Sequence, residues 1–157
     1  MRPRTILLLI AALPLIGSCA SPNQPGMPPT TGTGMIPSRI PADQLVGDWG
    51  LASYHQEGAR ARTETQARAQ CRNPYKITKG PTGGVVMHLA DSKEPTELFL
   101  KGSTDGKNYI GPEGPPTQGD GEITSFSGNV MTLRWLDPDL AGRFGTMIYV
   151  RCGAKRR

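Results

Sequence analysis

Apolar and polar residues alternate in short runs along most of the chain after residue 43. Trp49-Gly50-Leu51-Ala52-Ser53-Tyr54 alternates large and small side chains, as a half-buried strand does. Similar short runs, rich in Val, Ile, Thr, Tyr and Phe, follow at 74–78, 85–89, 97–101, 108–110, 122–127, 130–135 and 145–152. Gly and Pro separate these runs, which is typical of an all-β domain, and the pattern predicts about eight strands.

Short turns join most of these runs. Asp105-Gly106 is a strong hairpin signal, and Gly128-Asn129 joins two later runs. Strands that follow one another through tight turns pair as neighbours, and eight of them can close into an up-and-down barrel without exposed edges. We therefore predict a single small antiparallel β-barrel over residues 44–157, with a β-sandwich as the alternative. A polar loop at 112–120 and a break at 136–139 interrupt the series.

The one helical candidate is residues 57–70, EGARARTETQARAQ. Its alanines and arginines favour a helix, but the segment has no apolar stripe to bury. It is therefore either a short polar helix on the outer surface or a long loop.

The first 18 residues have the layout of a signal peptide. A basic start, Met1 to Arg4, precedes the apolar run Ile6 to Ile16 of about 11 residues. A membrane-spanning helix needs about 20 apolar residues, so this run is too short to span and fits the core of a signal peptide. The small residues Gly17 and Ser18 then lead directly to Cys19.

The run Ile16-Gly17-Ser18-Cys19 resembles the lipobox of bacterial lipoproteins. The resemblance implies that residues 1–18 are removed and that Cys19 carries the lipids that hold the protein in a membrane. No Asp follows Cys19, and in that family this points to the outer membrane. We therefore expect a lipid-anchored, periplasm-facing protein; an ordinary secretory signal with an incidental cysteine is the alternative.

Residues 19–43 read as a linker between the anchor and the barrel. Residues 20–43 contain six prolines, several Gly, Ser and Thr, and almost no charge. Such a composition cannot bury enough apolar surface to offset the entropy of ordering, so we expect a Pro-rich disordered tether. Its apolar positions, Ile36 and Ile40 among them, are the places where it would dock on the domain edge.

Charge and cysteine content narrow the partners and the compartment. Removing Arg2 and Arg4 leaves 16 basic against 13 acidic residues, a formal charge of +3. This excess is mild and an exported protein meets little nucleic acid, so we expect no nucleic-acid partner; the tail 155–157 either contacts anionic lipid or is simply solvated. In an oxidising compartment we expect Cys71 and Cys152 to form a disulfide; two separate thiols are the alternative.

No motif in the chain predicts catalysis. His55 and His88 have no ligand-like spacing, no Gly-x-Ser-x-Gly elbow is present, and there is no Gly-rich phosphate loop. We therefore predict a protein that is not an enzyme, with no metal and no cofactor.

Gly47-Asp48-Trp49, followed by about eight strands and a last strand with a cysteine, resembles the calycin superfamily of small barrels. That superfamily includes lipocalins, fatty-acid-binding proteins and bacterial metalloprotease inhibitors. The resemblance implies that Trp49 closes one end of the barrel and stacks on a basic residue of a late strand, with Arg134 and Arg151 as the candidates. The inhibitors are compact barrels with one disulfide.

The sequence thus favours a non-enzymatic envelope lipoprotein with a binding or structural role. We expect a monomer, attached to the membrane through its lipid, with a protein partner such as a protease. One alternative is a periplasmic protease inhibitor of the compact barrel class. The other is a carrier of a small hydrophobic ligand, in which Trp135, Phe99 and Met147 line or fill the interior.

Overall fold

The computed structural model describes residues 35–153. Cys19 and its signal, most of the predicted linker and the tail 155–157 lie outside the described residues. The strands are β1 (Ile36–Pro37), β2 (Gly47–Tyr54), β3 (Tyr75–Lys79), β4 (Val85–Met87), β5 (Thr96–Gly102), β6 (Asn108–Gly111), β7 (Gly121–Phe126), β8 (Val130–Trp135) and β9 (Thr146–Arg151). The helical segments are η1 (Ala42–Gln44), η2 (Glu57–Ala59), α1 (Arg60–Ala69), η3 (Gln70–Arg72) and α2 (Pro138–Phe144).

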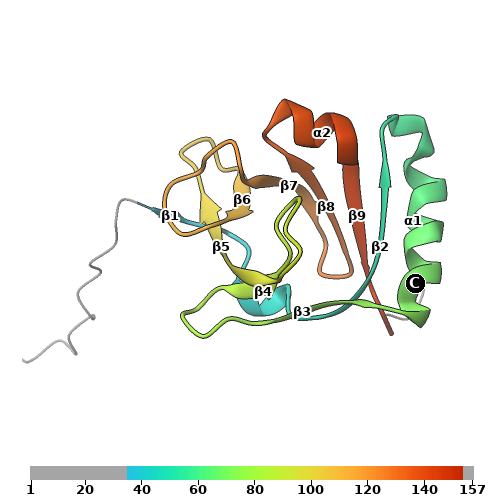
Figure 1. Ribbon diagram of the computed structural model, residues 1–157, viewed down its shortest axis with the longest axis horizontal. Helices are drawn as coiled ribbons and strands as arrows, with labels where there is room; N and C mark the ends of the chain where they lie inside the picture. The colour runs from blue at the N-terminus through green and yellow to red at the C-terminus, as the bar shows by residue number, and fades with distance from the viewer. Residues whose placement is uncertain (1–34, 154–157) are drawn as a thin grey trace, which may run out of the picture. The chain divides into compact units, whose positions relative to one another are not determined.

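Strands β2 to β9 form a closed antiparallel barrel of eight strands (Figure 1). Each strand pairs with the next along the chain, and β2 pairs with β9 from Trp49 opposite Arg151 to Tyr54 opposite Thr146. The β5–β6 pairing, from Phe99 opposite Gly111, completes the ring. The predicted barrel is confirmed, and the sandwich alternative is wrong.

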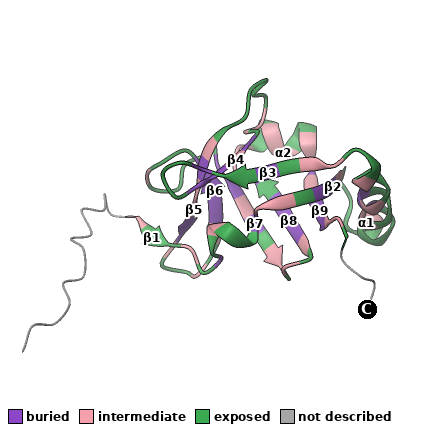
Figure 2. Cartoon of the chain, turned by 90° about the horizontal axis from the view of Figure 1, so that it is seen from below, coloured by how far each residue is buried: buried purple, intermediate pink, exposed green. Residues whose placement is uncertain are grey.

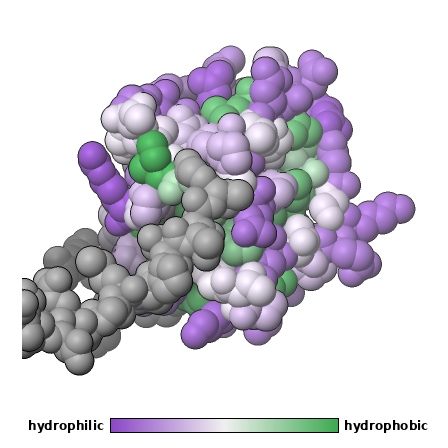
Figure 3. All heavy atoms as spheres, turned by 90° about the vertical axis from the view of Figure 1, so that its left-hand side faces the viewer, coloured by the Kyte–Doolittle hydropathy of each residue, from purple (hydrophilic) through white to green (hydrophobic). Residues whose placement is uncertain are grey.

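The last residues of the segment that the sequence assigned to the linker pack against the barrel. Ile36 and Pro37 form the extra strand β1, which pairs with the end of β5. Ile40 is buried against the main core, whereas Ile36 is 41% exposed. Ile36 is the one large apolar side chain that is exposed among residues 35–153. On the visible part of the surface in Figure 3, apolar groups form separate patches among hydrophilic ones.

Buried residues lie along the barrel strands (Figure 2), and most of their apolar members form one core cluster. They come from every strand of the closed ring because alternate residues of a strand point to opposite faces. The buried apolar residues of this core are Ile40, Leu45, Trp49, Ile77, Val85, Met87, Leu98, Ile110, Ile123, Met131, Leu133, Trp135 and Tyr149.

The segment at 57–72 is helical, which decides between the two alternatives that the sequence left open. Helix α1 covers the outer face of β2 and β9 (Figure 1). A second, smaller core lies beneath it, in which Ala67 meets Ile148 and Val150. A Cβ atom on Gly50 would lie 1.9 Å from the carbonyl oxygen of Ala67, so only glycine allows this close approach.

Helix α2 was not expected, since the sequence pattern indicated only a break at 136–139. The Asp137 carboxylate accepts hydrogen bonds from the backbone nitrogens of Asp139 and Leu140 at 2.8 and 3.0 Å, and Pro138 takes the first helical position. Gly145, at φ 65°, ends the helix. Asp-Pro-Asp is therefore a helix start rather than a turn. No helix within residues 35–153 is long and apolar enough to cross a bilayer.

Candidate functional site

One end of the barrel is closed around Trp49. Its indole Nε1 donates a hydrogen bond of 2.8 Å to the carbonyl oxygen of Leu45, in the turn that follows η1. The guanidinium carbon of Arg151 lies 4.2 Å from the centre of the Trp49 ring. Arg151 also donates to the carbonyl oxygens of Gly128, Val46 and Gln44. Every polar group of this plug thus has a partner.

The two candidate arginines lie in different environments. Arg151 ends β9 opposite Trp49, so the register of the β2–β9 pair places it over the ring. Arg134 is exposed on β8, where it lies opposite Glu122 and Thr146, and no stacking contact joins it to Trp49.

A disulfide stands beside the closed end. Cys71 and Cys152 are bonded, with their Cα atoms 5.5 Å apart. The bond joins η3, at the end of the helical segment, to the residue that follows β9. The predicted pairing is present.

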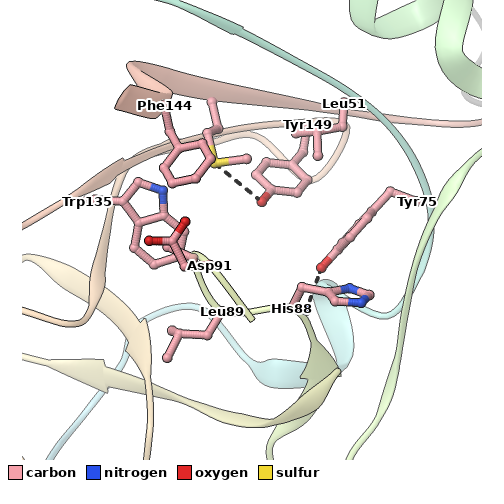
Figure 4. Close-up of a pocket in the computed structure, with 10 residues that line it drawn as sticks. Leu51, Tyr75, His88, Leu89, Asp91, Trp135, Phe144 and Tyr149 are labelled. Atoms are coloured by element: carbon pink, nitrogen blue, oxygen red, sulfur yellow. Dashed lines mark hydrogen bonds between the residues drawn. The ribbon is translucent and has the colours of Figure 1, made fainter. Parts of the chain in front are cut away.

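The other end of the barrel holds a pocket of about 140 Å³ (Figure 4). Aromatic rings form most of its wall: Tyr75, Trp135, Phe144 and Tyr149. Aliphatic and sulfur-containing side chains fill the gaps between the rings, and these are Leu51, Leu89 and Met147. Of the interior residues suggested by the sequence, Trp135 and Met147 line this pocket and Phe99 does not.

Three hydrogen-bond donors on residues that line the pocket have no strong acceptor. Trp135 Nε1 is buried and has no hydrogen-bond partner within residues 35–153. The Tyr149 hydroxyl reaches only the Met147 sulfur, at 4.0 Å. The Tyr75 oxygen accepts a 2.7 Å bond from the backbone nitrogen of His88, which leaves its own proton free to donate. This end is therefore rich in unused donors.

Both tyrosines keep their protons at ordinary pH. Burial is the main cause that raises the pKa of Tyr149, and the nearby Tyr75 adds to it. Burial also raises the pKa of Tyr75, partly offset by the bond from His88. The pocket thus presents neutral hydroxyl groups.

An ion pair spans the rim of the pocket. Asp91, in the loop after β4, has a positive φ of 61°. Its carboxylate accepts from both arms of Arg143 in α2, one at 3.1 Å. The hydrogen bond to Asp91 is the main cause that raises the pKa of Arg143. Asp91, the one acidic residue of the lining, is thereby neutralised by a cation outside the lining.

A second ion pair is deeply buried, and the sequence did not indicate it. Lys101 Nζ lies 2.6 Å from Asp120 Oδ2, with the two side chains 1% and 0% exposed. Asp120 also accepts from the backbone nitrogen of Thr117 at 3.1 Å. Lys101 lies on β5 and Asp120 ends the loop 112–120, so the pair ties this loop to the barrel wall. The Asp120 carboxylate also lies so close to β6 that a Cβ atom on Gly111 would collide with it. This ion pair therefore has a structural role.

Nothing in the described part of the chain gathers metal ligands. No group of three or more His, Cys, Asp or Glu that could hold a metal occurs in residues 35–153. His55 and His88 are both exposed, and only His88 borders the pocket. The expectations of no metal, no cofactor and no enzymatic activity stay predictions.

No protein-family model, curated protein or solved structure matches this chain. Of the two resemblances, the structure supports only the eight-stranded antiparallel barrel.

The sequence indicated Trp135 and Met147 but missed Tyr75, Tyr149 and Phe144 as wall residues. Strand alternation was the available signal: Met147 and Tyr149 are two residues apart on β9 and so share the inner face. Phe144 lies on α2, which the sequence analysis did not expect.

Proposed function

We propose that this chain is a lipid-anchored, non-enzymatic binding protein of the bacterial envelope, which takes up a small ligand at the open end of its barrel. The observation that carries the proposal is the aromatic pocket with a buried, unpartnered donor, Trp135 Nε1. Buried polar groups in folded proteins nearly always have a partner, so an unpartnered donor on a residue that lines a concave apolar site favours a place for a ligand there.

The lipid anchor is supported by the residues around Cys19. The basic start, short apolar run, small pair and cysteine come in lipobox order, and no Asp follows. An anchor at the outer membrane would hold the barrel on the periplasmic side, where the Cys71–Cys152 disulfide is stable. A diacylated cysteine gives stable attachment because two chains bind a bilayer far more firmly than one.

Pocket size limits the ligand class. A cavity of about 150 Å³ lined by apolar side chains binds benzene, and the pocket here is about 140 Å³. A long acyl chain needs several times this space. If the protein is a carrier, its ligands are therefore limited to molecules about the size of one aromatic ring.

Two experiments test the two halves of the proposal. Cys19→Ala should move the protein from the membrane pellet to the soluble fraction, while Ser21→Ala, two residues further on, leaves it in the pellet. A Cys19→Ala protein that still sediments with membranes would exclude the lipid anchor. Native mass spectrometry of the full chain, after incubation with ring-sized compounds, should detect a bound mass that denaturation releases.

A filled-pocket variant makes the second experiment specific. Ala90 lines the pocket, so Ala90→Leu adds a side chain into that space and should abolish the bound mass. The matched control is Ala61→Leu, at an exposed position of α1, which should retain it. Equal retention by both variants would place the ligand elsewhere.

The second candidate function is protease inhibition, and the plugged end favours it. A barrel closed by Trp49 and Arg151 and held by one disulfide supports this candidate, because the compact inhibitors that the sequence resembles are also barrels with one disulfide. The full chain, mixed with bacterial metalloproteases in molar excess, would lower their activity if it served as an inhibitor. Undiminished proteolysis would exclude this candidate.

A further inference from the structure

We infer that the pocket at the open end recognises a neutral, ring-sized aromatic molecule that carries a carbonyl oxygen, with Trp135 Nε1 as the donor to that oxygen. This inference rests on the proposed binding function and adds the chemical class of the ligand. It has three parts: a flat ring, an acceptor atom and the absence of net charge.

The ring follows from the walls. Tyr75 and Tyr149 lie with their ring centroids 5.9 Å apart in an edge arrangement, and Figure 4 shows Trp135 on the opposite side of the pocket. Aromatic side chains pack on other aromatic rings in edge or offset contacts. A single six-membered ring fits both this lining and the volume of about 140 Å³.

The acceptor follows from the donors. Trp135 is 5% exposed, and its N–H has no partner among the described residues. A buried donor without an acceptor is unfavourable, and a ligand oxygen that displaces the side chains covering this N–H would restore the missing bond. Figure 4 shows the hydroxyl groups of Tyr75 and Tyr149 directed toward the space between them and Trp135. These hydroxyls provide further donors, so a ligand rich in acceptors fits and a ligand rich in donors does not.

Neutrality follows from the charges around the pocket. Asp91 is the one carboxylate in the lining, and Arg143 already engages both of its oxygens. No lysine or arginine lines the pocket, so an anionic ligand would meet Asp91 with no free cation to receive it. A cationic ligand would face N–H and O–H donors. A neutral carbonyl group supplies an acceptor, and it is neither repelled by Asp91 as an anion is nor opposed by the donors as a cation is.

The test compares two isosteric probes on the full chain. Acetophenone carries a carbonyl oxygen where α-methylstyrene carries a methylene group, and the two otherwise share size and shape. The chain contains two tryptophans, so labelling with ¹⁵N-tryptophan gives two indole N–H signals in a heteronuclear NMR spectrum. Trp49, whose N–H already donates to Leu45, is the internal control for Trp135.

We expect acetophenone to shift the Trp135 indole signal downfield and to leave the Trp49 signal in place. It should bind roughly 3- to 10-fold more tightly than α-methylstyrene, as one additional hydrogen bond predicts. Trp135→Phe should remove this preference, and Tyr149→Phe should reduce it. Tyr54→Phe, a matched loss of a hydroxyl group outside the barrel, should preserve it.

Three results would overturn the inference, and they separate it from the proposed function. Equal affinity for both probes would show an apolar pocket that does not recognise an acceptor. The proposed binding function would then be retained, and the proposed ligand class would be wrong. Tighter binding of benzoate than of acetophenone would exclude the neutral class. No shift of the Trp135 signal with any ring-sized probe would overturn the inference and the proposed pocket function together.

Discussion

The two tryptophans of this barrel occupy opposite ends and opposite chemical situations. Trp49 has its N–H bonded to Leu45 and its ring covered by Arg151. Trp135 is almost as deeply buried, yet its N–H has no partner and its ring borders an open space. The closed end is built for stability because each polar group is satisfied. At the open end one buried N–H lacks a hydrogen bond, and such a local loss of stability is typical of a binding site.

The largest effect should come from removing the plug itself. Trp49 is fully buried, so Trp49→Ala should lower the free energy of unfolding by about 3–5 kcal/mol. Trp135→Ala should cost at least about 1 kcal/mol less, because it breaks no hydrogen bond and its ring already faces a void. Urea unfolding of both variants measures the difference, and equal losses would contradict the contrast between the ends.

The disulfide should contribute the next largest share to the closed end. It spans 81 residues, and replacing both Cys71 and Cys152 by serine should cost about 2–4 kcal/mol in oxidising buffer. With a reducing agent present, the variant and the parent chain should unfold at the same urea concentration. A loss of equal size in both buffers would argue that packing, not the covalent bond, is responsible.

Arg151 and Arg134 form a natural pair for the third test. Arg151→Met keeps a long apolar stem but loses donors to three carbonyl oxygens and should cost about 2 kcal/mol. Arg134→Met, at an exposed position of β8, should change stability by less than about 0.5 kcal/mol. Thermal or urea unfolding measures both. A comparable cost for Arg134→Met would disagree with the assignment of Arg151 as the residue that closes the barrel.

Tyr149, which reaches the pocket, should make stability depend on alkaline pH. Its pKa is raised in the folded state by burial, while the unfolded value is about 10. Its contribution is therefore complete below pH 10 and is lost as the pH rises toward the folded value. Between pH 9 and pH 11 the parent chain should lose about 1.4 kcal/mol more than Tyr149→Phe. Identical pH dependence of the two proteins would contradict this.

The smallest effect should come from Trp135→Phe. The substitution keeps a ring and removes a donor that has no acceptor, so stability should change by no more than about 0.5 kcal/mol. Trp49→Phe, which leaves the Leu45 carbonyl without its donor, should cost about 1–2 kcal/mol. Denaturant unfolding measures the loss of stability in both variants. Because both substitutions remove the same atoms, the difference between them reports the Trp49 hydrogen bond.

Local patterns explain why much of the fold was readable from the sequence. The alternation in Trp49 to Tyr54 and the turns at Asp105-Gly106 and Gly128-Asn129 act between near neighbours, so the strands appear where they were expected. Helix α1 was ambiguous because its buried face consists of Thr63 and Ala67, and small side chains leave no apolar stripe. Helix α2 was missed because the signal of Asp137 and Pro138 fits a turn equally well.

The strands, their order and the pairing of Cys71 with Cys152 follow from the sequence alone, because they depend on alternation, on turns and on residue type. The anchor at Cys19 stays a prediction from the sequence. That Arg151 rather than Arg134 covers Trp49 became clear only from the three-dimensional arrangement, since it depends on the register of β2 against β9. The tertiary structure alone placed Trp135, Tyr75 and Tyr149 around one space. A pocket is a property of the gaps between side chains from distant strands, and no local pattern encodes whether a buried N–H finds an acceptor there.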